Sequence, residues 1–204
     1  MPTDITRTTR VDFRAAAVLD RPNIAAAMML VVSLCSQMDY RWAVVLAEML
    51  EAEAAIGVAM FNAVDNQQAK GRLLIAAANK RLSADHHKQL KALIRDAIKA
   101  AGLRNLIAHG QWGGVPGDVD GIVLGDGRWA STAVAGLLSR TYGAETILGS
   151  IPPSMSLSRY TVDDFQNDAG AIADLIERQI ELTEAFKKYR ATVRGMAMPD
   201  TSYD

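Results

Sequence analysis

Apolar residues recur at three- and four-residue spacings through much of this chain, and this helical period limits what the chain can fold into. Between residues 39 and 64 the apolar stripe consists of Trp42, Val45, Met49, Ala52, Ile56, Ala59 and Ala63. A later stripe consists of Leu90, Leu93, Ile94, Ala97 and Ile98. Half of the residues are apolar but only 6% are aromatic, so the core must be built from small and aliphatic side chains. The pattern predicts an all-α fold of packed helices.

Residues that cap helices mark where the expected helices begin. Pro22 follows an aspartate and an arginine, which gives a cap and a first-turn proline for a helix through the next apolar run. Asn66 lies at a capped junction after the first stripe, and Ser83 opens the helix that carries the second. Thr161, followed within three residues by two aspartates, resembles the N-cap of a final amphipathic helix that ends at about Val193.

Residues 110–159 depart from the helical period. They are rich in glycine, contain three prolines, and include short β-favouring stretches at 121–124 and 146–148. The stretch 125–127, Gly-Asp-Gly, is a candidate for a tight turn. The sequence therefore predicts a small loop or β-hairpin insert within an otherwise helical chain.

The domain organisation follows from the chain length and from these elements. A chain of 204 residues suits one hydrophobic core. We expect an N-terminal polar arm or short strand over residues 1–19 and a single helical domain over residues 20–195, which contains the insert. Residues 196–204 are expected to form a flexible tail.

Charge and cysteine content narrow the partners and the compartment. The chain has 22 basic and 23 acidic residues, so no global field favours nucleic acid or an anionic membrane, and any polyanion site must be local. The longest apolar run, residues 24–35, is shorter than the roughly 20 residues that span a bilayer, so we expect no membrane partner. The single cysteine, Cys35, excludes an internal disulfide and fits a reducing compartment, the cytoplasm.

The chemistry of the chain is expected to centre on one short segment, residues 104–110, with the sequence Arg-Asn-Leu-Ile-Ala-His-Gly. In a helix Asn105 and His109 share a face, and Arg104 lies at its edge. An arginine binds phosphate through paired N–H donors, and a histidine exchanges protons near neutral pH. Together they suit phosphodiester cleavage without a metal. The asparagine is expected either to hold the imidazole in one tautomer or to contact the substrate.

A purely structural interpretation of the same segment is open as well. Arg104 would then pair with a carboxylate such as Glu51 or Glu53, and Asn105 would cap a kink at Gly102, which is expected to interrupt the helix. His109 would lie at a helix C-terminus, where the dipole favours a basic side chain. Gly110 would provide a left-handed cap.

Other chemistries find no support in the sequence. Three histidines and one cysteine do not give the ligand spacing of a zinc site. The glycine-rich stretch at residues 113–117 lacks the lysine of a phosphate-binding P-loop. We expect neither a metal nor a cofactor.

The segment resembles the signature of the HEPN superfamily, in which four to six residues separate an arginine from a histidine. The form Arg-Asn-x-x-Ala-His-Gly, here followed by Trp112, is similar to that of uncharacterised bacterial HEPN-like proteins. The resemblance extends over the helical stretch at residues 39–101, the irregular segment after the motif and the closing helix. It implies an up-and-down helical bundle that forms a homodimer with the two motifs facing each other.

The resemblance further implies a metal-independent endoribonuclease of a toxin–antitoxin or phage-defence type, with RNA as substrate and a cognate antitoxin protein as a partner. His109 would act as general base or acid toward the ribose 2′-hydroxyl and the leaving oxygen, and Arg104 would stabilise the charge on the phosphate. Asn105 would orient both groups. The sequence does not choose a supporting acid among three glutamates, Glu48, Glu51 and Glu53.

A second hypothesis from the sequence is a noncatalytic HEPN-like helical module for binding or dimerisation, because many members of the superfamily retain the bundle without activity. A basic approach to His109 favours RNA over this alternative. Basic residues recur at three- and four-residue spacings along one expected helix face: Lys88, Lys91, Arg95 and Lys99. The structural alternative for these four residues is a solvated surface face.

Overall fold

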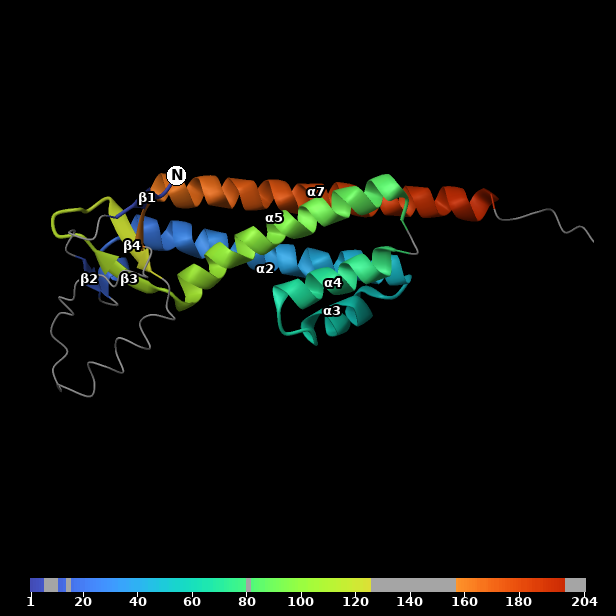
Figure 1. The fold of residues 1–204 in the computed structure, drawn as a ribbon, viewed down its shortest axis with the longest axis horizontal. Helices are drawn as coiled ribbons and strands as arrows, with labels where there is room; N and C mark the ends of the chain where they lie inside the picture. Colours follow the sequence, from blue (N-terminus) through green and yellow to red (C-terminus); the bar gives the residue numbers. More distant parts are fainter. Residues whose placement is uncertain (6–10, 14–15, 80–81, 126–156, 197–204) are drawn as a thin grey trace, which may run out of the picture. The chain divides into compact units, whose positions relative to one another are not determined.

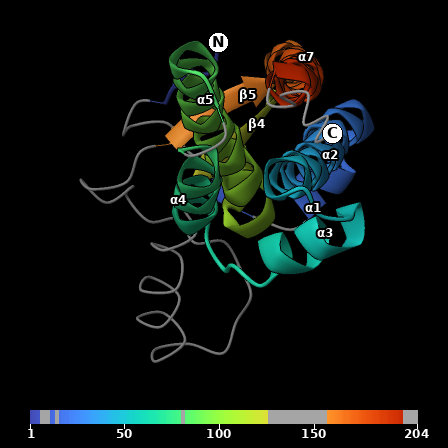
Figure 2. The same ribbon diagram turned by 90° about the vertical axis from the view of Figure 1, so that its right-hand side faces the viewer.

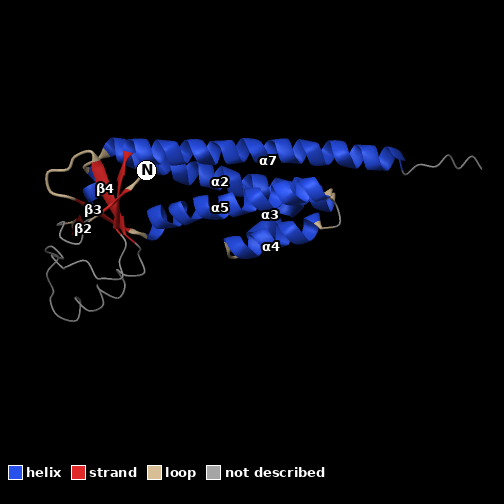
Figure 3. Cartoon of the chain, turned by 45° about the horizontal axis from the view of Figure 1, so that its top comes forward, coloured by secondary structure: helices blue, strands red, loops and turns tan. Residues whose placement is uncertain are grey.

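The computed structural model describes residues 1–5, 11–13, 16–79, 82–125 and 157–196 of the chain, which are mainly helical (Figure 3). The helices are α1 (Ala16–Leu19), α2 (Pro22–Leu50), α3 (Ala54–Asn62), α4 (Gln67–Ala78), α5 (Ala84–His109) and α7 (Val162–Met196). The strands are β1 (Thr3–Asp4), β2 (Asp12–Phe13), β3 (Gln111–Gly114), β4 (Gly121–Gly125) and β5 (Leu157–Thr161), of which the first four are labelled in Figure 1. The helical prediction is confirmed, but the strands show that the fold is not all-α.

The strands form one five-stranded antiparallel sheet in the order β1-β5-β4-β3-β2. The stretch predicted to be a strand at 121–124 is the central strand β4. The sheet is larger than the predicted hairpin because the N-terminal arm supplies both edges: Thr3 pairs with Arg159 of β5, and Phe13 pairs with Gly113 of β3. The β-favouring stretch at 146–148, most of the turn candidate at 125–127 and nearly all of the expected tail lie outside the described residues.

The chain divides into two compact units. The first consists of Met1–Leu34 and Ala101–Ala171, and the second of Cys35–Ala100 and Ile172–Asp204. The divisions fall within α2, α5 and α7, so each of these helices contributes residues to both units. The predicted domain over residues 20–195 therefore includes parts of both units.

In the first unit, aliphatic and aromatic side chains form the core between the sheet and the ends of the helices. Val11, Val123 and Leu157 form a buried cluster, and Ile5, Phe13 and Val115 pack against it. At the start of α7, the rings of Tyr160 and Phe165 stack with centroids 5.1 Å apart. The predicted cap of α7 is confirmed. Asp164 accepts the Thr161 N–H at 2.9 Å, and the Thr161 hydroxyl oxygen accepts the Asp164 N–H at 3.3 Å, which is a reciprocal capping box.

The second unit is a group of packed helices. Figure 2 shows α3 on the side of α2 and α4 on the side of α5. Two glycines permit this packing: a Cβ on Gly57 of α3 would overlap the Ala43 carbonyl of α2, and one on Gly71 of α4 would lie 2.9 Å from Ile94 of α5. Among the largest fully buried side chains here are Met38, Leu46, Phe61, Leu74 and Leu90. The single cysteine, Cys35, is buried, as expected for a small apolar residue.

The helix boundaries differ from the predicted ones in two places. The helix expected over residues 39–64 is instead the second half of α2 followed by α3, because Glu51 takes a left-handed backbone conformation with φ of 56° and breaks the helix. Gly102 does not interrupt α5, since one glycine costs a helix only about 1 kcal/mol relative to alanine and packing outweighs that cost. Four residues of the two apolar stripes are exposed and lie outside the core: Ile56, Ala59, Ala63 and Ile98.

Among the described residues, no helix combines the length and the apolar character that crossing a membrane requires.

The N-caps predicted at Asn66 and Ser83 are present, because their side chains accept the N–H of Ala69 and of His86. The predicted start at Pro22 is confirmed as well.

Replacement of Gly102 by alanine should stabilise the protein. A Cβ at this position meets no atom within 4 Å, so the substitution removes only the flexibility that glycine gives the unfolded chain. We expect the free energy of unfolding to rise by about 0.5–1 kcal/mol in denaturant titrations. Gly57→Ala is the matched control and should destabilise, because its Cβ would overlap the Ala43 carbonyl. Equal effects of the two substitutions would contradict the close approach of Gly57 to α2.

Candidate functional site

The motif predicted from the sequence forms the last two turns of α5, within the first unit. Arg104, Asn105 and His109 are all exposed, whereas Ile107 between them is only 3% exposed. Burial of Ile107 fixes the rotation of this part of the helix, and the polar residues of the motif consequently face solvent.

Arg104 and Asn105 are directly bonded. The Nη1 group of Arg104 donates to Oδ1 of Asn105 at 3.0 Å. This bond occupies the amide oxygen of Asn105 and leaves its NH₂ group as the remaining donor. Asn105 therefore contacts the guanidinium, and the roles expected for it toward the imidazole and the substrate stay predictions. Asn105 does not cap a kink at Gly102, because α5 continues through that residue.

His109 is the final residue of α5, and Gly110 joins the helix to the sheet. The Gly110 N–H donates to the Leu106 carbonyl at 2.8 Å, and β3 begins at the next residue, Gln111. The predicted left-handed cap is wrong, since Gly117 is the glycine that has a positive φ in the described part of the chain. Glycine is required at position 110 because a Cβ would overlap the Leu106 carbonyl and lie 2.9 Å from the Gly125 carbonyl. His109 is thus fixed at a tight junction between helix and sheet.

The hairpin that follows the junction is held by a network of charged groups. Asp118, in the β3–β4 connection, accepts two hydrogen bonds from the Arg159 guanidinium of β5, at 2.5 and 2.7 Å. Its backbone carbonyl accepts a third bond from Arg21, at 2.6 Å. A Cβ on Gly121 would overlap the Arg159 guanidinium, so glycine at that position gives the arginine its place over the sheet. The bonds from Arg159 hold the pKa of Asp118 below its ordinary value despite partial burial, which acts in the opposite direction.

The depressed pKa of Asp118 predicts a loss of stability in acid. Its carboxylate stabilises the fold fully above the unfolded pKa of about 4, and this contribution is lost as the pH falls through the lower, folded-state value. Asp118→Asn should lower the free energy of unfolding by about 1–2 kcal/mol at pH 7 and have progressively less effect below pH 4. Asp120→Asn, an exposed neighbour in the same loop, is the control, with an expected change under about 0.5 kcal/mol. A pH-independent effect of Asp118→Asn would rule out the ion pair as the cause.

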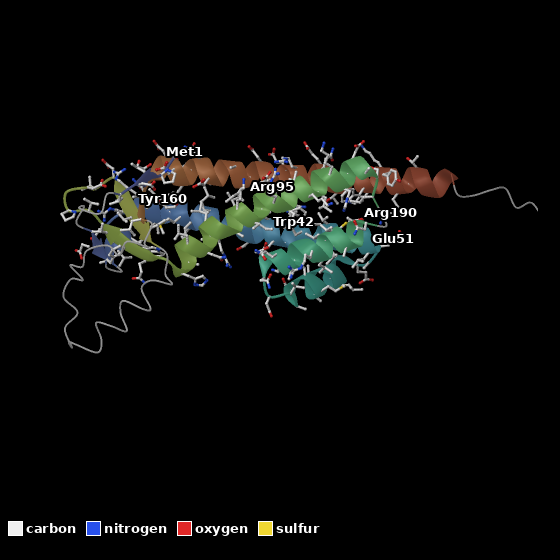
Figure 4. All side chains as sticks on the ribbon, in the orientation of Figure 1. Met1, Trp42, Glu51, Arg95, Tyr160 and Arg190 are labelled. Atoms are coloured by element: carbon white, nitrogen blue, oxygen red, sulfur yellow. The ribbon has the colours of Figure 1, made fainter. Side chains whose placement is uncertain are left out.

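The three candidate supporting acids belong to the second unit. Glu48 accepts a bond from Arg190 at 3.0 Å and pairs with Lys187 at 3.8 Å, so its charge is already compensated. Glu51 occupies the left-handed break after α2 and is labelled with Arg190 in Figure 4. Glu53 is the N-cap residue of α3 but makes no side-chain cap bond. The pairing of Arg104 with Glu51 or Glu53, and the choice of a supporting acid, stay predictions.

The four basic residues predicted to contact RNA lie on α5 in the second unit, and all are exposed: Lys88, Lys91, Arg95 and Lys99. Arg95, labelled in Figure 4, pairs with its neighbour Asp96 at 3.4 Å. Lys88 lies on the wall of a groove of about 790 Å³ between α5 and α7. The opposite wall contains Arg178 and Glu181, which sequence reasoning missed because a groove between two helices follows only from their packing.

Comparison of the chain with protein-family models, with curated proteins and with solved structures finds no match. The resemblance to the HEPN superfamily therefore rests on the motif and its sequence context. The described residues contain no group of three or more histidine, cysteine, aspartate or glutamate side chains suited to holding a metal ion.

Removal of the motif side chains should leave the fold intact. Arg104→Ala, Asn105→Ala and His109→Ala each remove an exposed group, and we expect the free energy of unfolding to change by less than about 0.5 kcal/mol. Ile107→Ala is the internal comparison and should cost about 2–4 kcal/mol, because it creates a cavity at a buried position. Thermal and denaturant unfolding of the four variants measure both effects. Large losses in the first three would show that the motif is structural.

Proposed function

We propose that this chain is a metal-independent endoribonuclease whose site is assembled from the motifs of two subunits in a homodimer. The observation that carries the proposal is the exposure of Arg104, Asn105 and His109 together at the end of α5, while Ile107 anchors the same turns in the core. A polar cluster of this composition on a fixed support suits recognition of a phosphodiester. The resemblance to the HEPN superfamily supports the same activity and a toxin–antitoxin or phage-defence role.

The proposed reaction is an internal transfer at phosphorus. The neutral imidazole of one His109 removes the proton of the ribose 2′-hydroxyl, and the 2′-oxygen attacks the adjacent phosphorus atom. The bond from phosphorus to the 5′-oxygen of the next nucleotide breaks, and that oxygen takes a proton from the protonated imidazole of the partner subunit's His109. The products are a 2′,3′-cyclic phosphate and a 5′-hydroxyl. The reaction uses two imidazoles, one neutral and one protonated. Each subunit supplies one of them and therefore provides half a site.

Arg104 has a separate role in this proposal. Its guanidinium stabilises the negative charge that develops on the non-bridging phosphate oxygens. The bond of 3.0 Å to Asn105 limits the orientations open to a side chain that is otherwise long and exposed. Asn105 is thus a positioning residue, because it acts through Arg104.

Purified wild-type protein should cleave RNA in the presence of EDTA and leave 2′,3′-cyclic phosphate ends. His109→Ala should lower the rate by about 10²–10⁴-fold, as expected for loss of a general acid or base, and Arg104→Ala should lower it by at least about tenfold. Arg41→Ala, a second exposed arginine, is the matched control and should leave the rate unchanged. Sequencing of the RNA ends and gel analysis of the products measure these outcomes. Cleavage that survives in His109→Ala, or that needs a divalent metal, would refute the proposal.

The noncatalytic helical module is the second candidate. The groove between α5 and α7 favours it, because Lys88 and Arg178 on its walls are accompanied by acids of opposite charge, Asp85 and Glu181. Such mixed walls suit a protein partner better than a long polyanion. On this proposal Arg104→Ala and His109→Ala change dimerisation without any effect on RNA. Sedimentation of these variants, together with growth of a bacterial host expressing wild type or His109→Ala, separates the two candidates.

A further inference from the structure

Helix α3 has an unusual sequence for a helix that faces solvent. Residues 54–64 contain no charged side chain. Ile56 is 49% exposed and Met60 is 40% exposed, and three alanines on the same outer side are exposed as well: Ala55, Ala59 and Ala63. A helix that is apolar all round is ordinarily buried on all sides, whereas this one leaves its outer face in contact with water.

The inner face of α3 accounts only for its attachment to the second unit. Gly57 approaches α2 so closely that a Cβ would overlap the Ala43 carbonyl, and Phe61 is 1% exposed. A helix of nine residues is too short to be stable alone, so this packing is what maintains it. About half of the surface of Ile56 and of Met60 is exposed, and that part makes no contact with the rest of the second unit. Gly57 and Phe61 are the buried residues of α3, so Ile56 and Met60 retain apolar surface that this packing leaves uncovered.

The charges at the two ends of α3 restrict what can cover its outer face. Glu53 precedes the helix and Asp65 follows it, and both are exposed. Two copies of this face would place acids against acids in either orientation, and an anionic membrane would be repelled for the same reason. The partial negative charge at the C-terminus of α3 adds to that of Asp65 and favours a cation there. An apolar centre with acidic ends is complementary to an apolar surface with basic ends.

We propose that the outer face of α3 is a docking site for an amphipathic helix of a different polypeptide. The apolar stripe of that helix packs on Ile56 and Met60, and its basic residues lie against Glu53 and Asp65. Nine residues of α3 extend about 13 Å, which matches two to three turns of a partner helix. Recognition is by packing of one amphipathic helix on another, with apolar anchors for affinity and charged ends for orientation.

Two synthetic peptides test the proposal on the full-length protein. Both have 18 residues and the same leucine and alanine stripe, but one has lysines in its first and last turns and the other has glutamates. Fluorescence anisotropy should give a dissociation constant at least tenfold lower for the lysine peptide, with a difference that shrinks as salt is added. The double variant Ile56→Lys with Met60→Lys should lose at least tenfold of the affinity for the lysine peptide. The matched control, Met29→Lys with Leu30→Lys, changes exposed apolar residues of α2 in the first unit and should bind as wild type does.

Several outcomes would overturn the proposal. These are equal affinities for the two peptides, binding of neither peptide, or unchanged binding by the α3 double variant. A wild-type dimer that dissociates in the same variant would make a second copy of the chain the occupant instead. Association with vesicles of phosphatidylcholine and phosphatidylglycerol that the variant abolishes would make it a membrane surface. Circular dichroism of both double variants confirms that the comparisons are made on folded protein.

Discussion

The first unit depends on the ion pair between Asp118 and Arg159. Both carboxylate oxygens of Asp118 accept from Arg159, and its carbonyl accepts from Arg21, so one loop residue connects strand β5, the β3–β4 hairpin and the start of α2. A two-point bond between a guanidinium and a carboxylate fixes orientation as well as distance. The glycine at position 121 is a consequence, because any side chain there would displace the guanidinium. This network sets the sheet against which the end of α5 is placed.

The position of the motif follows from that sheet. Gly110 is confined between the Leu106 and Gly125 carbonyls, so the last turn of α5 and the end of β4 are in close contact across one residue. His109 cannot move far relative to the sheet without separating these groups. Its side chain nevertheless faces solvent, as do those of Arg104 and Asn105. A rigid support with exposed polar groups is what a site requires when its second half comes from another subunit, because the geometry must already be set before the two halves meet.

The sequence was a good guide where one local signal decided the structure. Capping residues located the starts of α2, α4, α5 and α7, since each supplies a side-chain acceptor or a fixed φ in its own turn. It failed where distant residues decide. A short strand over residues 1–19 was one of the two expected alternatives, but β1 and β2 have two residues each and show no period, so their pairing with β5 and β3 was not predicted. The left-handed backbone conformation of Glu51 likewise follows from no spacing rule. The location of the motif was predictable, but its internal hydrogen bond was not.

Because the chain is nearly neutral, binding of a charged ligand depends on local surfaces, and two such surfaces differ in their chemistry. The motif concentrates hydrogen-bonding and titratable groups that suit a phosphate. Helix α3 presents the opposite chemistry, an uncharged face between two acids, which repels phosphates and favours a basic, apolar partner. One ligand cannot satisfy both surfaces by the same contacts, since the acidic ends of α3 repel the phosphate groups that the motif suits. Because the motif belongs to the first unit and α3 to the second, substitutions at one surface leave the side chains of the other unchanged.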